Sequence, residues 1–226
     1  MANITVAANE RHHTGPRTDI ARMPTHLSRA LDVVEATIAL VIALPMLAAA
    51  ALAIRLSSRG PVIFRQVRVG RNGRLFEVLK FRTMHVDADP EVHRRFVTSM
   101  QSSEFSDDRT FYKLVADTRV TRVGRLLRRL SIDELPQLLN VLRGDMRLVG
   151  PRPALPYEVA RYDRWQRRRL AVRPGITGLW QVSGRSKLSY TEMLALDVRY
   201  VETRSLRQDL AIVVRTIPAL LRREAA

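Results

Sequence analysis

Two adjacent carboxylates, Asp133 and Glu134, stand between arginines in the stretch RRLSIDELPQLLNVLRGDMRLVGPRP. A carboxylate can attack phosphorus when a metal ion and arginines screen the negative charges that keep the two partners apart. Arg128 lies five positions before Asp133, and Arg152 lies in a Gly-Pro-Arg-Pro turn whose proline rings restrict the backbone. A hard Mg²⁺ held by Glu134 and by substrate phosphate oxygens suits this ligand set. The stretch is therefore a candidate site for phosphate chemistry.

The same acidic pair also has a purely structural interpretation. Ser131 with Glu134 three positions later fits a capping box, in which the acid begins a helix. Pro136 is tolerated near a helix start, so Asp133 and Glu134 would lie at the positive end of the helix dipole, where a phosphate is also stabilised. Spacing alone favours the capping role and leaves the catalytic role open.

The charge of the chain predicts anionic partners. The formal net charge is +16, and the 38 basic residues are 35 arginines and 3 lysines. Nucleic acid, acidic lipid and phosphorylated small molecules all fit this balance, and a GC-rich genome would also enrich arginine. The absence of cysteine excludes disulfides and thiolate metal sites, as expected for a reducing compartment.

One long apolar run, VVEATIALVIALPMLAAAALAI, lies between Asp32 and Arg55. As a helix its 22 residues would span about 33 Å, enough for a hydrocarbon core of about 30 Å. Both flanks carry arginines, which disfavours a straight crossing because positive flanks stay cytoplasmic. A helix broken near Pro45 would keep both flanks on one side, whereas a straight transmembrane helix would tolerate the proline. The residues leave these two alternatives even.

The remaining chain predicts one further folding unit. Alternating apolar and basic residues over 61–84, around Asn72-Gly73, predict a hairpin. The polar stretch 85–118 predicts short helices and a surface loop. Three basic amphipathic segments, 121–130, 156–172 and 205–223, are expected to form helices that lie either on an anionic membrane surface or in solvent.

Taken in order, the motifs resemble those of a known family. They are Arg29-x-x-Asp32, GPVIFRQVRVGRNGRLFEVLKFRTM, RVTRVGRLLRRLSIDELPQLLNVLRGDMRLVGPRP and RPGITGLWQVSGRS, and they cover roughly 28–219. The chain resembles the bacterial sugar transferases, the monotopic polyprenyl-phosphate phosphoglycosyl transferases. It is most similar to the short members that start exopolysaccharide repeats.

This resemblance implies an α+β, mostly helical fold at the cytoplasmic face of the bacterial inner membrane. Residues 1–27 would be a disordered tail, residues 28–58 a re-entrant membrane helix broken near Pro45, and residues 59–226 the catalytic domain. A small β-hairpin and interfacial amphipathic helices would surround an active site that faces the cytosol. Arg29, Asp32 and Pro45 would be the structural residues of the membrane segment. Oligomeric state stays open.

The resemblance also implies a reaction and roles for individual residues. Asp133 would attack a UDP-sugar, release UMP and carry the phosphosugar covalently until polyprenyl (undecaprenyl) phosphate accepts it. Glu134 would bind Mg²⁺, and Arg128 and Arg152 would hold phosphate. The block RPGITGLWQVSGR would shape the nucleotide and sugar pocket through three residues, Arg173, Gln181 and Arg185. The expected sugar is a hexose, galactose or glucose.

Two positions depart from the family pattern. Ser28-Arg29 replaces a common Lys-Arg pair, although Arg29 could still form an intrahelical ion pair with Asp32. Thr203-Arg204 replaces Asn-Trp after the Asp197 and Tyr200 motif, which predicts altered membrane seating rather than lost catalysis.

Other classes of protein fit less well. Only the positive charge favours a nucleic-acid-binding protein, because the sequence contains no helix-turn-helix, zinc or RNA-stacking motif. A purely structural membrane protein leaves the Asp-Glu pair unexplained. A kinase or a soluble phosphodiesterase also fits less well, because the sequence contains neither a P-loop nor a histidine-rich metal cluster.

Overall fold

The computed structural model describes residues 25–89, 91–92, 94–95, 98 and 117–221. The expected N-terminal tail lies almost wholly outside the described residues, as does much of the polar stretch 85–118. The described part is mostly helical with two small sheets, which confirms the predicted α+β class.

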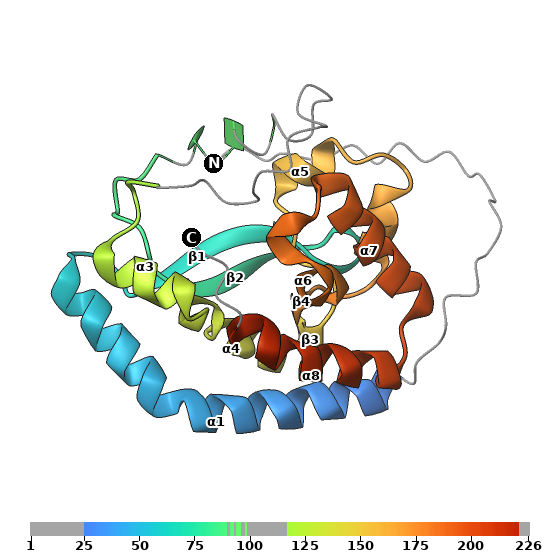
Figure 1. Ribbon diagram of the computed structural model, residues 1–226, viewed down its shortest axis with the longest axis horizontal. Helices are drawn as coiled ribbons and strands as arrows, with labels where there is room; N and C mark the ends of the chain where they lie inside the picture. The colour runs from blue at the N-terminus through green and yellow to red at the C-terminus, as the bar shows by residue number, and fades with distance from the viewer. Residues whose placement is uncertain (1–24, 90, 93, 96–97, 99–116, 222–226) are drawn as a thin grey trace.

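The apolar run forms most of helix α1, Thr25–Ser57, which lies along the base of the molecule in Figure 1. Pro45 lies inside this helix, and the helix remains continuous through it. The axis of α1 bends partway along its length in Figure 1, as expected when a proline removes a backbone hydrogen bond. The structure therefore has a bent helix at the place where a break was expected.

The predicted hairpin is confirmed. Strand β1, Ile63–Val69, pairs antiparallel with β2, Leu75–Phe81, so that Val69 faces Leu75 across the turn. The turn contains the short 3₁₀ helix η1, Arg71–Gly73, and its Asn72 has a left-handed backbone with φ of 56°. Asparagine tolerates this conformation better than most residues, which explains the Asn-Gly signal in the sequence.

Helix α3, Arg122–Arg129, confirms the first amphipathic segment and begins at a capping residue. The Thr121 side chain accepts a hydrogen bond of 2.8 Å from the Gly124 backbone N–H. A Cβ atom at Gly124 would lie 2.0 Å from the Thr83 carbonyl oxygen, so only glycine allows α3 to approach the chain after β2 this closely.

The capping box expected at Ser131 is not formed. Ser131 has a left-handed backbone with φ of 56° and makes no capping hydrogen bond. The acidic pair instead ends a single 3₁₀ turn, η3, Ile132–Glu134, and helix α4, Gln137–Arg143, begins only after Pro136. The expectation was wrong because Ser131 turns the chain out of α3 and cannot then serve as an extended N-cap.

The C-terminal half packs helices around a second small sheet, in which β3, Arg147–Val149, pairs parallel with β4, Gly175–Thr177. The expected helix over 156–172 is split into α5, Pro156–Ala160, and η4, Gln166–Ala171. Tyr162, between the two pieces, and Arg169 of η4 are both buried, and the Arg169 guanidinium donates to the Tyr162 hydroxyl. The chain continues through the short helices α6, Leu179–Ser183, and η5, Arg185–Lys187, then α7, Tyr190–Thr203, and α8, Leu206–Leu221. Helix α8 confirms the third amphipathic segment.

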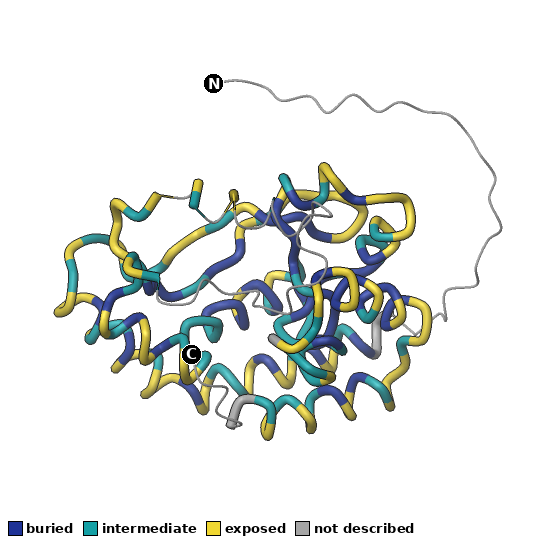
Figure 2. The backbone as a smooth tube through the Cα atoms, turned by 45° about the horizontal axis from the view of Figure 1, so that its top comes forward, coloured by how far each residue is buried: buried dark blue, intermediate teal, exposed yellow. Residues whose placement is uncertain are grey.

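Helix α1 packs on the body through its inward face, while its outer face is exposed, as Figure 2 shows. Ala36 of α1 joins Val78 of β2 and Val141 of α4 in one buried cluster, and Ile54 joins Phe81 and Leu127 in another. The outward side chains are large and apolar: Leu31, Val34, Ile38, Val41, Ile42, Leu44, Met46, Leu52 and Leu56. Both ends of α1 therefore contact the same body.

Polar contacts fix the first turns of α1. Arg29 donates to the backbone carbonyl oxygens of Val141 and Leu142, and Asp32 accepts a 2.8 Å hydrogen bond from Arg147 Nε. The expected ion pair between Arg29 and Asp32 is not found among the described residues. Arg29 bonds instead to backbone carbonyls of α4, and Asp32 pairs with Arg147.

Arg147 extends this contact to the C-terminal helices. It also binds Asp209 of α8 at 3.2 Å, and Asp209 accepts a 2.7 Å hydrogen bond from the Tyr200 hydroxyl of α7. We call Asp32, Arg147, Tyr200 and Asp209 the Asp32 network. It joins α1, β3, α7 and α8 through buried charge.

Candidate active site

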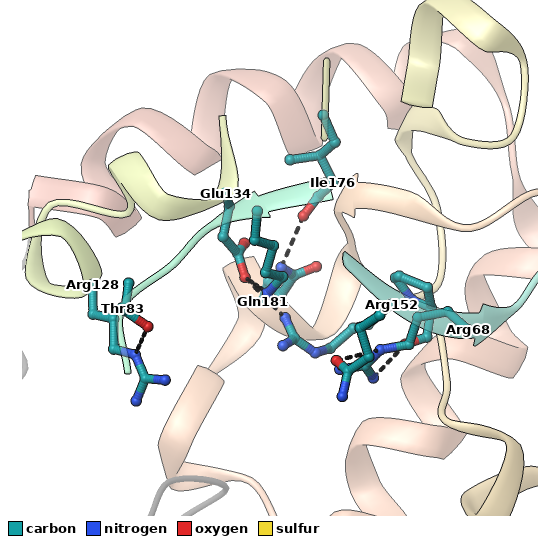
Figure 3. A network of polar contacts seen from close by, with 10 residues as sticks. Arg68, Thr83, Arg128, Glu134, Arg152, Ile176 and Gln181 are labelled. Atoms are coloured by element: carbon teal, nitrogen blue, oxygen red, sulfur yellow. Dashed lines mark hydrogen bonds and ion pairs between the residues drawn. The ribbon is translucent and has the colours of Figure 1, made fainter. Parts of the chain in front are cut away.

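The acidic pair lies where η3 meets strand β2. The Lys80 Nζ atom lies 2.7 Å from Glu134 Oε1, and Arg152 Nη1 lies 3.5 Å from the same oxygen. Figure 3 shows Glu134 between the Arg128–Thr83 pair on one side and Arg152 with Arg68 on the other. The structure therefore surrounds the acidic pair with cations, as the spacing of Arg128 and Arg152 suggested.

Asn140 of α4 ties this helix to β2. Its side chain is fully buried, accepts a 3.0 Å hydrogen bond from the Leu79 N–H and donates a 2.6 Å hydrogen bond to the Glu77 carbonyl oxygen. The amide thus acts as a further strand partner for β2, next to Lys80. This contact sets the position of the Lys80–Glu134 ion pair.

The Asp133 carboxylate has no hydrogen-bond partner among the described residues. Burial together with the charge of Glu134 raises the pKa of Asp133 to about 6. A raised pKa means that the ionised form is poorly stabilised, so the carboxylate gains by bonding to an electrophile. Asp133 is nevertheless largely ionised at neutral pH.

Glu134 behaves in the opposite way. Burial alone would raise its pKa, but the charges and hydrogen bonds of Lys80 and Arg152 outweigh burial and lower the pKa to about 2. Two adjacent acids are thus held in different electrostatic states, which separates a reactive carboxylate from a charge-paired one.

The arginines near the pair are themselves positioned by the fold. Arg128 Nε donates to Thr83 Oγ1 at 2.8 Å, and burial lowers the pKa of its guanidinium. The backbone carbonyl of Arg152 accepts a 2.8 Å hydrogen bond from Arg169, which forms a buried ion pair with Asp197. The side chain of Arg128 and the backbone of Arg152 are therefore both fixed before a substrate arrives.

A cavity of about 110 Å³ opens beside Glu134, between η3, β4, α6 and α8. We call it the Glu134 cavity. Gln181 and Arg185, two of the expected pocket residues, line it, so the structure brings them to the acidic pair. Arg173 lies elsewhere, where the nearby charges of Arg29 and Arg71 act on it. The structure thus separates Arg173 from the other two.

The donor set fits a metal ion that takes part of its coordination from substrate. The described residues contain no group of three or more acidic or histidine side chains close enough to hold a metal ion. Mg²⁺ commonly binds one or two carboxylates together with phosphate oxygens and water. Asp133 and Glu134 meet this requirement but do not form a complete protein cage.

Lys80 is a residue of the candidate site that the sequence patterns did not single out. It is one of three lysines in a chain of 35 arginines. Along β2 it falls two positions after the buried Val78, on the same face of the strand. A charged side chain on the buried face of a strand needs an oppositely charged partner. A lysine at this strand position could therefore have indicated an ion pair.

The chain is similar to bacterial proteins that are named as sugar-phosphate transferases or exopolysaccharide production proteins. The family model described as bacterial sugar transferase matches residues 23–223. The chain is 43% identical over 192 residues to the exopolysaccharide production protein ExoY of Sinorhizobium fredii, with 85% of this chain and 84% of that protein covered. It is 47% identical over 205 residues to the UDP-glucose:undecaprenyl-phosphate glucose-1-phosphate transferase of Caulobacter vibrioides, with 85% and 69% covered. It is 40% identical over 207 residues to the undecaprenyl-phosphate galactose phosphotransferase of Salmonella typhimurium, with 91% and 42% covered.

Paired carboxylates held among cations suit a site that handles phosphate groups, and the matching family model is one of transferases. The matched region contains the whole acidic site and every residue that the structure describes. The chain belongs to the bacterial sugar transferase family, and the resemblance seen in its motifs is confirmed.

Proposed function

We propose that this protein transfers a sugar 1-phosphate from a UDP-sugar to polyprenyl (undecaprenyl) phosphate, giving polyprenyl-diphosphate-sugar and UMP. The observation that carries the proposal is the free carboxylate of Asp133 next to the charge-paired Glu134. The names of the relatives from Caulobacter vibrioides and Salmonella typhimurium support the general reaction. They also support glucose or galactose as the sugar, and the name of ExoY supports a role in exopolysaccharide production.

In the first step, an Asp133 carboxylate oxygen attacks the β-phosphorus of the UDP-sugar. The bond between that phosphorus and the bridging oxygen breaks, UMP leaves with the oxygen, and an aspartyl-phosphosugar forms. In the second step, a phosphate oxygen of polyprenyl phosphate attacks the same phosphorus and the bond to Asp133 breaks. The free carboxylate is restored, so no proton needs to be stored between the steps.

The cations lower the barrier to bringing three negative groups together. Lys80 and Arg152 both contact Glu134, and Figure 3 shows Arg128 on the side of Glu134 away from Arg152. In this proposal all three cations would face the substrate phosphates. Mg²⁺, bound to Glu134 and to phosphate oxygens, would neutralise charge on the leaving UMP. Because Lys80 contacts Glu134 directly, it holds that carboxylate in place for the ion.

We further propose that α1 is re-entrant, so that residues 28–58 enter and leave through the cytoplasmic leaflet of the inner membrane and 59–226 form the catalytic domain. The helix is long and apolar enough to cross a membrane. However, both of its ends contact the same body, through Arg29 near the start and Ile54 near the end. A straight crossing would carry one end to the opposite side, which supports the bent arrangement around Pro45.

The reaction is tested with washed membranes, undecaprenyl phosphate, Mg²⁺ and a panel of UDP-sugars. UMP release and a radiolabelled phosphosugar adduct on the protein should both require Asp133 and disappear in Asp133→Asn. Asp87→Asn, the same change at an exposed acid, is the matched control. Full turnover by Asp133→Asn would disprove the nucleophile.

The topology is tested with single cysteines, because the native chain has none. Ala30→Cys and Ser57→Cys place thiols at exposed positions near the two ends of α1. In intact cells neither should react with an impermeant maleimide, and both should react after lysis. Labelling of one end alone before lysis would establish a straight crossing.

A further inference from the structure

Arg82, the residue after β2, is a buried arginine that the proposed reaction does not use. Only 6% of its surface is exposed. None of the ion pairs among the described residues includes Arg82, so no carboxylate in that part of the chain balances its charge. A buried charge is costly without partners. The groups to which Arg82 does bond therefore indicate its role.

The Arg82 guanidinium bonds to the turn that follows α1. Its Nη1 donates to the Arg59 carbonyl oxygen at 2.7 Å, and its Nη2 donates to the Ser58 carbonyl oxygen at 2.9 Å. Carbonyls at the end of a helix have no partner within it and carry its negative dipole, so a buried cation stabilises them. Gly60 in this turn has φ of 115°, and a Cβ atom there would lie 2.1 Å from Arg82 Nη1. Only glycine lets the turn close over the guanidinium this tightly.

Thr83, the next residue, bonds to an arginine of the acidic site. Its Oγ1 accepts a 2.8 Å hydrogen bond from Arg128 Nε, and its carbonyl oxygen accepts one of 3.0 Å from the Thr121 N–H. Thr121 is the N-cap of α3, the helix that carries Arg128 in its last turn. Thr83 therefore positions both the helix and the guanidinium of Arg128. Figure 3 shows the Arg128–Thr83 bond on the side of Glu134 away from Arg152.

Arg82 and Thr83 together link the end of α1 to Arg128. The backbone N–H of Arg82 donates to the Val62 carbonyl oxygen at 2.9 Å, so its backbone and its side chain both hold the turn after α1. One planar peptide bond joins Arg82 to Thr83, so a shift of Arg82 is passed to the Thr83 hydroxyl. A misplacement of about 1 Å near reacting groups can cost about a hundredfold in rate. If Arg82 only capped α1, its loss would lower stability and leave the orientation of Arg128 unchanged.

We propose that Arg82 is a positioning residue for Arg128: by holding the turn after α1 it fixes the Thr83 hydroxyl, which orients the Arg128 guanidinium toward substrate phosphate. The inference rests on the proposed function, in which Arg128 holds phosphate, and deepens it. The end of the apolar helix α1 thereby becomes part of the frame that orients an arginine of the active site.

The test is a double-mutant cycle on UMP release from a UDP-sugar. Arg82→Met and Thr83→Val should each lower kcat/KM by about ten- to a hundredfold. In an Arg128→Met background the same changes should lower kcat/KM by less than about twofold, because the residue through which they act is already lost. Thr83→Ser keeps the hydroxyl and should stay close to the wild type. Leu194→Ala, in a separate buried cluster, should instead have the same effect in both backgrounds.

Arg55→Met is the matched control, because the Arg55 guanidinium bonds from an exposed position to the Gly60 carbonyl oxygen of the same turn, at 3.5 Å. It should match the wild type. Amide exchange at Thr121, whose N–H bonds to the Thr83 carbonyl, measures the link without substrate and should accelerate in Arg82→Met. Should Arg82→Met fail to fold, Arg82→Lys, which keeps the charge on a single nitrogen, takes its place.

Two results would overturn the positioning role of Arg82. They are equal losses of kcat/KM in the wild-type and Arg128→Met backgrounds, and unchanged amide exchange at Thr121. If the wild type released no UMP from any UDP-sugar, the proposed function itself would fail, whereas exchange at Thr121 would still decide whether Arg82 holds Thr83.

Discussion

At the scale of single residues, the surroundings hold two adjacent acids in different electrostatic states. Asp133 is poorly stabilised as an anion, whereas Glu134 is held as one by Lys80 and Arg152. The difference arises from a lysine 54 positions earlier in the chain. A carboxylate kept ionised by its neighbours is a good ligand, and one that lacks partners is a better nucleophile.

Lys80→Met should lower the rate of UMP release by about a hundredfold, because it removes the charge that holds Glu134 ionised and positioned. Loss of that charge should also raise the pKa of Glu134, so activity should require a higher pH than in the wild type. Rates across pH 5–8 with Lys187→Met, which removes an exposed lysine, as the control check this. Equal profiles for the two variants would contradict a role for Lys80.

Asp133→Asn should stabilise the folded protein at pH 7.5 while abolishing activity. The folded pKa of about 6 lies above the ordinary 3.8, so the native state binds the proton more tightly and loses stability as pH rises from about 4 through 6. Removing the ionisable group should recover about 1–2 kcal/mol at pH 7.5 and almost nothing at pH 4. Thermal unfolding in detergent with EDTA measures this, and an equal effect in Asp87→Asn would contradict it.

At the scale of elements, the site depends on how α4 docks against β2. The Asn140 side-chain amide bonds to the backbone of β2 as a neighbouring strand would. It accepts from the Leu79 N–H and donates to the Glu77 carbonyl oxygen. The acidic turn η3 precedes α4 directly, so the docking of α4 also determines where Glu134 meets Lys80.

Asn140→Leu should destabilise the protein by about 2–4 kcal/mol, because it leaves a buried N–H and a buried carbonyl without partners. UMP release should fall as well, even at temperatures where the variant is folded, since β2 is no longer held next to η3. Arg143→Ala, an exposed change on the same helix, should have almost no effect on either property. Thermal unfolding and single-turnover rates together distinguish these outcomes.

Elements set by short-range pattern were predictable, and contacts between distant segments were not. The Asn72-Gly73 turn, helix α3 and helix α8 follow from residues within each segment. The partners of Glu134, Asn140 and Thr177 lie 54, 61 and 39 positions away, so only the folded chain reveals them. The capping box failed for a related reason, since Ser131 takes the backbone conformation that joins two helices.

At the scale of the whole molecule, most of the exposed large apolar side chains lie on α1 and α8. Leu210, Val214 and Ile217 of α8 are exposed, as are the outward side chains of α1. Surface apolar groups of this extent mark contact with lipid or with another protein. A membrane in contact with the outer face of α1 could also contact the exposed apolar side chains of α8.

Ile42→Asp should shift the protein out of the membrane fraction, since Ile42 is 74% exposed and would carry its charge into lipid. Leu210→Ser with Ile217→Ser should weaken retention after a high-salt wash by a smaller amount. Arg161→Asp, an exposed change outside α1 and α8, is the control. Retention of Ile42→Asp equal to that of the control would argue against burial of α1 in lipid.

The Asp32 network has a consequence for enzyme engineering. A common route to a soluble biocatalyst is to delete the hydrophobic segment or to exchange it for another anchor. Here that deletion would remove one of the two carboxylates that face Arg147, together with the oxygen that accepts the Leu148 N–H. Arg147 and Leu148 lead directly into the turn that carries Arg152. A soluble version would need a designed helix that reproduces Arg29 and Asp32 on its inner face, with only the outer face made polar.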